Sequence, residues 1–241
     1  MSTVSSLPLR LEGVGYAVAG ATLVDDLSFA LEAGPRTVIL GPNGAGKSVT
    51  LRLCHGLLAP TSGRIRAGAT GLDTARHRQA MVFQRPVLLR RSALANVAYA
   101  LALRGHGRRE RSVRASAALA RVGLEALARR PARVLSAGEQ QRLALARAWA
   151  TEPEVLFLDE PTANLDPGAA RQVEAAIDAI HRSGTKIVMT THDLGQARRM
   201  ADEILFLHQG RLIERAEAGE FFAHPRTQEA QAFVRGELLP N

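Results

Sequence analysis

Cysteine is almost absent from this chain of 241 residues, and aromatic residues make up only 4% of it. The single cysteine, Cys54, excludes an intramolecular disulfide framework and a cysteine-rich metal cluster, and it favours a reducing compartment. No run of 18 consecutive apolar residues occurs, so we expect no membrane span. The start has no basic stretch followed by a long apolar run, so we expect no signal peptide and a location in the cytoplasm.

Lysine is scarce as well. The 31 basic residues include only two lysines, Lys47 and Lys186, and the formal net charge is +8. The excess belongs to one internal segment, because residues 85–147 contain 14 arginines and 3 acidic residues. A positive field attracts polyanions, so nucleic acid and an anionic membrane surface are candidate partners. A compositional bias of the genome toward arginine remains open beside them.

Short, continuous apolar runs bounded by turn residues recur along the chain, at 37–40, 81–83, 155–158, 186–190 and 204–207. Continuous apolar character is typical of strands that are buried on both faces of a parallel sheet. Helix-like stretches lie between the runs, at 47–58, 167–183 and 193–202. This alternation predicts an α/β core.

The remaining segments differ from that core. Residues 92–150 are rich in Ala, Leu and Arg at helical spacing and contain no comparable apolar run, which predicts an all-helical insertion. Breaks at 105–107, 123 and 130–131 divide it. The N-terminal stretch 9–33 is predicted as short strands and turns.

A glycine-rich loop follows the first predicted strand and opens a helix. Residues 41–48 read GPNGAGKS, which fits the pattern G-x-x-x-x-G-K-S. The glycines allow backbone N–H groups to point inward and hold phosphates at a helix N-terminus. Lys47 is expected to reach the β and γ phosphates, and Ser48 to ligate magnesium.

Polar residues also follow three other predicted strands, where ligands of parallel sheets gather. Asp159 is the candidate for holding magnesium, and Glu160 for polarising an attacking water. An acidic helix cap is the structural alternative for this pair. His192 is a candidate hydrogen-bond donor to a γ-phosphate, and Gln84 a magnesium or water ligand; each alone also fits a polar strand end.

Taken with LSAGEQQRLALARAWA at 135–150, these motifs resemble the ATPase subunit of ATP-binding cassette (ABC) transporters over nearly the whole chain. The resemblance implies an α/β fold, with a RecA-like parallel-sheet P-loop core, a small N-terminal antiparallel β part and an inserted helical subdomain. It implies one domain, in which 1–84 and 151–216 form the nucleotide-binding core. Residues 85–150 then form the helical subdomain with the signature motif, and 217–241 a loosely helical tail.

The resemblance also implies a function and its residues: a head-to-tail homodimer that encloses two ATP molecules with Mg²⁺. The implied catalytic residues are Glu160, His192 and Gln84, and the implied magnesium ligands are Ser48, Gln84 and Asp159. The implied ATP contacts are Tyr16, Gly41, Pro42, Asn43, Gly44, Ala45, Gly46, Lys47, Ser48, Val49, Ser136, Ala137, Gly138 and Glu139. Asp166 is implied to contact the partner copy near its catalytic water.

Three positions depart from the family pattern, two of them in the signature. Ala137 and Glu139 stand in the signature where LSGGQ has Gly and Gln, and Val49 stands where Thr is common. We expect Ala137 to take helical dihedral angles, for which a methyl group is harmless. We expect Val49 to leave the metal site intact, because Ser48 supplies the ligand.

The segments 46–63 and 82–101 are similar to ATPases of bacterial oxyanion importers, especially those for tungstate. That likeness implies import of tungstate or molybdate through a separate permease at the cytoplasmic face of the membrane, with a secreted solute-binding protein. Alternatives are another small-solute importer, for phosphate or an amino acid, or an exporter or release system. A cassette that remodels nucleic acid or ribosomes and an arginine-based nucleic-acid binder are also open. Segment 85–147 has little aromatic content for base stacking, so we expect no nucleic-acid partner.

Overall fold

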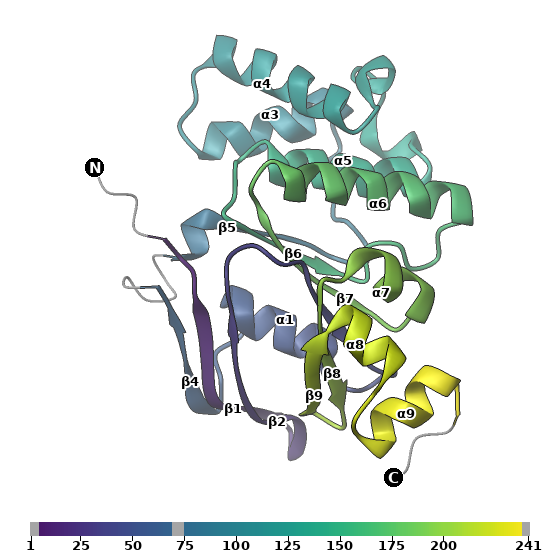
Figure 1. Ribbon diagram of the computed structural model, residues 1–241. Helices are drawn as coiled ribbons and strands as arrows, with labels where there is room; N and C mark the ends of the chain where they lie inside the picture. The colour runs from purple at the N-terminus through teal and green to yellow at the C-terminus, as the bar shows by residue number, and fades with distance from the viewer. Residues whose placement is uncertain (1–4, 69–74, 238–241) are drawn as a thin grey trace.

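A six-stranded sheet forms the centre of the molecule, with strand order β5-β6-β7-β3-β8-β9 (Figure 1). The structure is a computed structural model and describes residues 5–68 and 75–237. The other residues of the predicted core and tail ranges, 1–4, 69–74 and 238–241, lie outside the described residues. The strands are β3 (Thr37–Leu40), β5 (Gln79–Val82), β6 (Val155–Asp159), β7 (Lys186–Thr191), β8 (Glu203–His208) and β9 (Arg211–Glu217).

All neighbouring strands from β5 to β8 pair in parallel, and β9 returns antiparallel to β8. Side chains alternate between two apolar clusters along each central strand, because successive residues of a strand point to opposite faces. On β6, Leu156 and Leu158 belong to one cluster while Val155 and Phe157 belong to the other. Burial of both faces explains why these strands read as continuous apolar runs.

A second, antiparallel sheet has the order β2-β1-β4 and consists of β1 (Leu9–Val18), β2 (Ala21–Leu31) and β4 (Ser62–Ala67). Its inward side chains, such as Leu11, Val24 and Leu27, join the cluster that also contains Phe157 of the central sheet. Helix α1 (Lys47–His55) lies between the two sheets, and its residues Leu51 and Leu53 belong to the same cluster.

Three helices pack together at one end of the molecule: α3 (Ala93–Leu103), α4 (Arg108–Arg121) and α5 (Ala137–Trp149) (Figure 1). The remaining helices follow later in the chain: α6 (Pro167–Arg182), α7 (Leu194–Met200), α8 (Ala218–Ala223) and α9 (Gln228–Arg235). Single helical turns lie at 76–78, 125–127 and 132–134. Within the described parts of the chain, no helix is both long and apolar enough to cross a bilayer.

The α/β expectation is confirmed, and so are the five predicted strands within one or two residues. The helical character of 92–150 is confirmed as well. The breaks at 105–107 and 123 lie beside the ends of α3 and α4, and the break at 130–131 lies between the helical turns at 125–127 and 132–134. The N-terminal strands are longer than predicted, at 10 and 11 residues. Strands β4 and β9 were not predicted.

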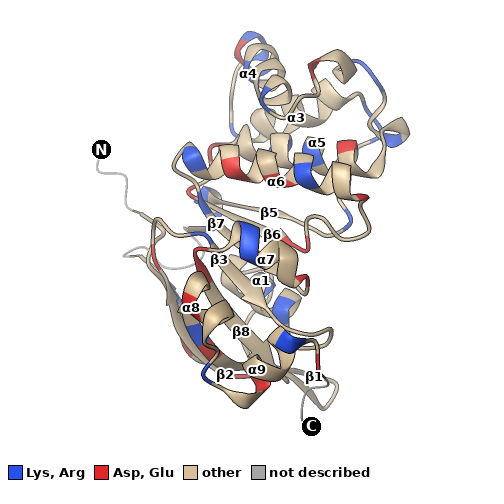
Figure 2. Cartoon of the chain, turned by 45° about the vertical axis from the view of Figure 1, so that its right-hand side comes forward, with Lys and Arg blue, Asp and Glu red and all other residues tan. Residues whose placement is uncertain are grey.

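The arginine-rich segment 85–147 covers these three helices and their connections (Figure 2). Several of its arginines serve the fold itself. Arg142 donates a hydrogen bond of 2.8 Å to the Val122 carbonyl, and the guanidinium of Arg121 lies 4.8 Å from the ring centroid of Trp149. Part of the basic excess is therefore used in packing.

Candidate nucleotide site

The phosphate-binding loop connects β3 to α1 at the carboxyl edge of the central sheet. Gly46, the residue before α1, has a φ angle of +91°, in the left-handed region that favours glycine. A Cβ atom at this position would lie 2.7 Å from the Leu23 carbonyl oxygen, too close for any side chain. Only glycine therefore allows the loop to wrap this closely against β2.

Lys47 is the first residue of α1, and its side chain is only 5% exposed. Its ammonium donates hydrogen bonds to the carbonyls of Gly41 and Pro42, at 2.9 and 3.0 Å, and lies 3.5 Å from Glu160 Oε1. Burial lowers the pKa of Lys47, and the nearby Glu160 opposes that effect. The loop carbonyls thus hold the ammonium beside the phosphate site.

Ser48 and Asp159 form an oxygen-rich corner beneath the loop. Ser48 Oγ donates to Asp159 Oδ1 at 2.7 Å, and Thr190 Oγ1 donates to the same oxygen at 2.9 Å. Hydroxyl and carboxylate oxygens are the donors that Mg²⁺ prefers. The residues therefore fit a magnesium ion bound with a nucleotide, in the roles predicted for Ser48 and Asp159.

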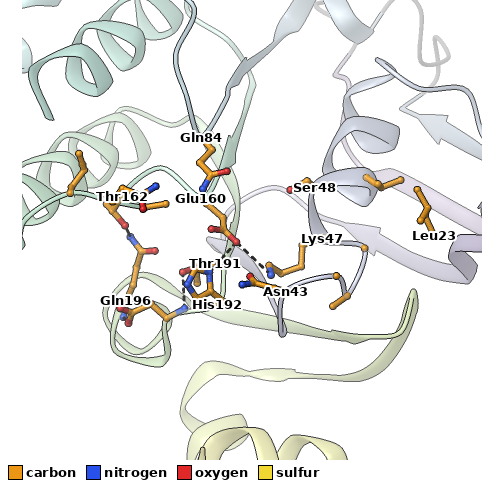
Figure 3. Close-up of a pocket in the computed structure, with 18 residues that line it drawn as sticks. Leu23, Asn43, Lys47, Ser48, Gln84, Glu160, Thr162, Thr191, His192 and Gln196 are labelled. Carbon is orange, nitrogen blue, oxygen red and sulfur yellow. Dashed lines mark hydrogen bonds and ion pairs between the residues drawn. The ribbon is translucent and has the colours of Figure 1, made fainter. Parts of the chain in front are cut away.

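Glu160 lies between Lys47 and His192. Its Oε1 atom is 3.1 Å from His192 Nδ1, in addition to the contact with the lysine (Figure 3). The Glu160 backbone has a φ angle of +43°, a conformation that costs a non-glycine residue about 1–2 kcal/mol. The Thr190 hydroxyl accepts a hydrogen bond of 2.9 Å from the Glu160 N–H and so helps to hold this turn.

A cavity of about 760 Å³ opens above these residues. Its lining includes Asn43, Gly44, Ala45, Gly46, Lys47, Ser48, Val49, Gln84, Glu160 and His192 among the predicted site residues. Gln84 lies two residues after the end of β5, and its side chain points toward Glu160 (Figure 3). The structure thus brings four separate motifs to one site, because the strands that carry them end at the same edge of the sheet.

Other predicted residues lie outside the lining. Asp159 sits below the cavity behind Ser48, and Gly41 and Pro42 contribute carbonyls to Lys47. Tyr16 lies on β1, paired with Val24, and packs against the apolar cluster between the sheets. Its predicted contact with a nucleotide base remains a prediction.

The signature residues 136–139 also lie outside this cavity, at the N-terminus of α5. Ser136 caps the helix: its Oγ accepts from the Glu139 N–H at 3.3 Å, while the Glu139 carboxylate accepts from the Ser136 N–H at 2.7 Å. The expectation that Ala137 is helical is confirmed, since α5 begins there. Gly138 packs tightly on α6, where its Cβ would lie 2.8 Å from that of Ala169.

Sequence reasoning missed several residues of the site. Leu23, Thr162, Thr191 and Gln196 line the cavity, and Thr190 supports it from β7. No local pattern distinguishes these residues, since Thr190 reads as part of a buried strand and Leu23 as part of an N-terminal one. Their roles follow from strand order and from the packing of α7.

A second cavity, of about 430 Å³, lies between the central sheet and the helices α3 and α5. We call it the helical groove; its lining includes Leu57, Tyr99 and Leu103, which are 43, 41 and 71% exposed. Both polar side-chain atoms of the buried Gln79, also in the lining, lack a hydrogen-bond partner among the described residues. Exposed apolar side chains gathered in one groove are typical of a surface that a partner covers.

The comparisons with known proteins agree on one family. The profile of the family described as ABC transporter matches residues 24–163. The tungstate uptake system ATP-binding protein TupC of Peptoclostridium acidaminophilum is 40% identical, over 90% of this chain and 100% of that one. The phosphate import ATP-binding protein PstB 2 of Natronomonas pharaonis is 36% identical, over 98% and 89%.

A solved structure agrees in fold. The dimeric post-hydrolysis structure of the ATP-binding cassette MJ0796, bound to ADP and Pi, superposes with a TM-score of 0.77 at 27% identity. The match covers 87% of this chain and 98% of that one.

Proposed function

Because this chain belongs to the ABC transporter family, we propose that it is the ATP-hydrolysing subunit of a bacterial importer that takes up an oxyanion, with tungstate or molybdate as the cargo. Subunits of this family bind ATP with Mg²⁺ and hydrolyse it to drive transport. The observation that carries the ATPase assignment is the convergence of Lys47, Ser48 and Glu160 on one cavity, with Asp159 hydrogen-bonded to Ser48.

The position of each residue in the nucleotide site indicates a separate role. Lys47 and the amides of the loop bind phosphates, and His192 stabilises the charge of the γ-phosphate. Mg²⁺, when bound through Ser48 and Asp159, neutralises phosphate charge. Glu160 accepts the proton of the attacking water.

The present contacts suggest an order of events for Glu160. Without a phosphate, its carboxylate is the counter-ion of the buried Lys47. A γ-phosphate competes for that ammonium, which releases Glu160 from the lysine. The base is then free to accept a proton only when the substrate is in place.

The site requires a second copy of the chain in this proposal. The signature residues Ser136 to Glu139 present a capped helix N-terminus, which favours an anion, yet they do not line their own chain's cavity. A head-to-tail homodimer places them against the partner's γ-phosphate. The dimeric state of MJ0796 supports this arrangement.

We propose the helical groove as the docking surface for the permease, which would hold the chain at the cytoplasmic face of the membrane. The groove suits an amphipathic segment whose apolar side covers Leu57, Tyr99 and Leu103. Phe83 lines the groove while the next residue, Gln84, lines the nucleotide cavity. One peptide bond therefore separates the two surfaces, which suits a role for Gln84 in coupling them.

The cargo assignment rests on TupC, whose full length is matched at 40% identity. Phosphate is the second candidate, because PstB 2 is 36% identical over 98% of this chain. A solute-binding protein outside the membrane completes either system.

The test measures cellular tungsten and molybdenum in a strain that lacks this chain, complemented with the wild-type chain or with Lys47→Ala. We expect accumulation from submicromolar tungstate or molybdate to be lost and to return only with the wild-type chain. Loss of phosphate or amino-acid uptake, with tungsten and molybdenum unchanged, refutes the cargo but keeps the importer. Unchanged uptake of all these solutes refutes the importer.

A further inference from the structure

A buried carboxylate outside the nucleotide cavity ties two helices together. Glu174 on α6 is 7% exposed, and it accepts two hydrogen bonds from the Arg199 guanidinium on α7. The distances are 3.0 Å from Nε to Oε2 and 2.8 Å from Nη2 to Oε1. A paired guanidinium of this geometry fixes direction as well as distance, so the pair holds α7 in one position on α6.

The same carboxylate is connected to the loop that follows Glu160. The Gln196 side chain, 2% exposed, donates through Nε2 to Thr162 Oγ1 at 2.5 Å and to Glu174 Oε1 at 3.4 Å. Thr162 lies two residues after Glu160. One amide therefore joins the Glu160 loop to the ion pair (Figure 3 shows Thr162 and Gln196 on one side of the cavity).

Gln196 is also tied to the turn that carries His192. Its backbone N–H donates to Asp193 Oδ1 at 2.7 Å, and the Asp193 N–H donates to Thr191 Oγ1 at 3.1 Å. His192 lies between these two residues. The position of Gln196 thus affects both the strand end with His192 and the loop with Glu160.

A small cavity of about 260 Å³ lies behind this network. Glu174 and Arg199 line it, whereas they do not line the nucleotide cavity. Thr162 and Gln196 are among the residues that line both cavities. The Gln196 amide contacts both Thr162 and Glu174, so it connects the ion pair directly to the wall of the nucleotide cavity.

We propose that Glu174 and Arg199 are positioning residues for ATP hydrolysis, which act through Gln196 to set the spacing between Glu160 and His192. The inference rests on the proposed ATPase function. Small displacements of groups that hold a reacting water reduce the turnover rate far more than nucleotide affinity. Residues that orient catalytic groups from behind typically change activity by about 10–100-fold.

A second ion pair in the chain provides a control for effects that arise from lost stability alone. Arg36 and Asp202 form a second two-bond pair, with 3.1 Å from Nε to Oδ2 and 2.8 Å from Nη2 to Oδ1. These residues precede β3 and β8, at the opposite edge of the sheet from the nucleotide cavity. Asp202→Asn therefore weakens an ion pair that does not contact Gln196, while Arg36 keeps its second partner, Asp178 on α6.

The experiment compares the wild-type chain, Glu174→Gln and Asp202→Asn by steady-state Mg-ATP hydrolysis, by calorimetric ATP binding and by thermal unfolding. We expect Glu174→Gln to lower kcat about tenfold with KM and Kd within about twofold. We expect both variants to lower Tm, and we expect kcat of Asp202→Asn to stay within about twofold of the wild type. Thr162→Val, which removes the acceptor for Gln196 at nearly constant volume, should lower kcat like Glu174→Gln.

Wild-type kcat in both Glu174→Gln and Thr162→Val overturns the inference, and so does an equal loss of kcat in Asp202→Asn. If Glu174→Gln does not fold, Thr162→Val against Asp202→Asn decides the question in the same way. A wild-type chain that neither binds nor hydrolyses Mg-ATP refutes the proposed function itself, and the inference falls with it. Wild-type hydrolysis beside an unaffected Glu174→Gln refutes the inference alone.

Discussion

Replacing Glu160 by Gln should separate nucleotide binding from hydrolysis in opposite directions. Gln has the shape of Glu but carries no charge and is a poor base. We expect the variant to bind ATP more tightly than the wild type and to lose turnover. The structure supports both parts, because Glu160 is at once the candidate base and the counter-ion of Lys47.

The size of the binding effect follows from the ion pair. Two unit charges 3.5 Å apart interact by about 5 kcal/mol at an effective dielectric constant near 20. Most of this is offset, because the two carbonyls continue to hold the ammonium and desolvation opposes the pair. If about 1.4 kcal/mol remains, ATP affinity rises about tenfold. Loss of the general base should lower kcat by about 10²–10⁴-fold.

Calorimetry with ATP and with ADP, in magnesium buffer, measures the binding effect. The gain should be larger for ATP, because in the proposed site the γ-phosphate is the group that competes with Glu160 for the Lys47 ammonium. The apo variant should also unfold at a lower temperature, since a buried ammonium has lost its counter-ion. Weaker ATP binding than wild type, or hydrolysis near the wild-type rate in the presence of the permease, refutes the reasoning.

Three further predictions follow from other parts of the structure. Lys47→Ala should abolish ATP binding, and a micromolar affinity retained in calorimetry contradicts the role of the lysine. Leu103→Glu should reduce stimulation of ATP hydrolysis by the permease, whereas Val113→Glu, equally exposed on α4 but outside the groove, should not; equal effects exclude the groove as the docking surface. Burial lowers the pKa of His55 from 6.5 to about 4, so the unfolded chain binds an extra proton between these values and stability falls as pH drops through that window. His55→Gln should flatten the pH dependence of the urea midpoint between pH 7 and 5, and an unchanged slope rejects this.

The sequence predicted those elements whose signal is local. The phosphate loop lies in a short pattern, and the central strands are continuous apolar runs because both of their faces are buried. Strand β4 escaped prediction because four of its six residues are exposed, so that Ser62–Ala67 reads as a polar turn. Strand β9 follows a tight hairpin, and three of its seven residues are exposed, so it has no continuous apolar run. It falls at the end of the predicted core range, where no strand was predicted.

Among the site residues, too, those with a local sequence signal were predictable and those held by tertiary contacts were not. Asp159, Glu160 and His192 were predictable because strand ends with polar residues are visible in the sequence. Thr190 and Gln196 were not, because their partners are 31 and 34 residues distant and are set by the order of the strands and by the packing of α7. Side chains that support a site through tertiary contacts leave no periodic signal.

The nucleotide cavity lies between two surfaces that can each influence it, the helical groove on one side and the α6–α7 pair on the other. Phe83 and Gln84 leave β5 on one side of the nucleotide cavity, toward the helical groove, while Thr162 and Gln196 close it on the other, toward α6 and α7. Asp159 ends β6, the strand next to β5, and Glu160 follows it. A displacement of the residues on either side of the cavity can therefore reach these two carboxylates while the sheet stays in place. In the two proposals made above, a permease docked at the helical groove and the ion pair that holds α7 act on the same carboxylates from opposite sides. Loss of kcat through Glu174→Gln should add to loss of stimulation through Leu103→Glu, because the two reach the site by separate residues.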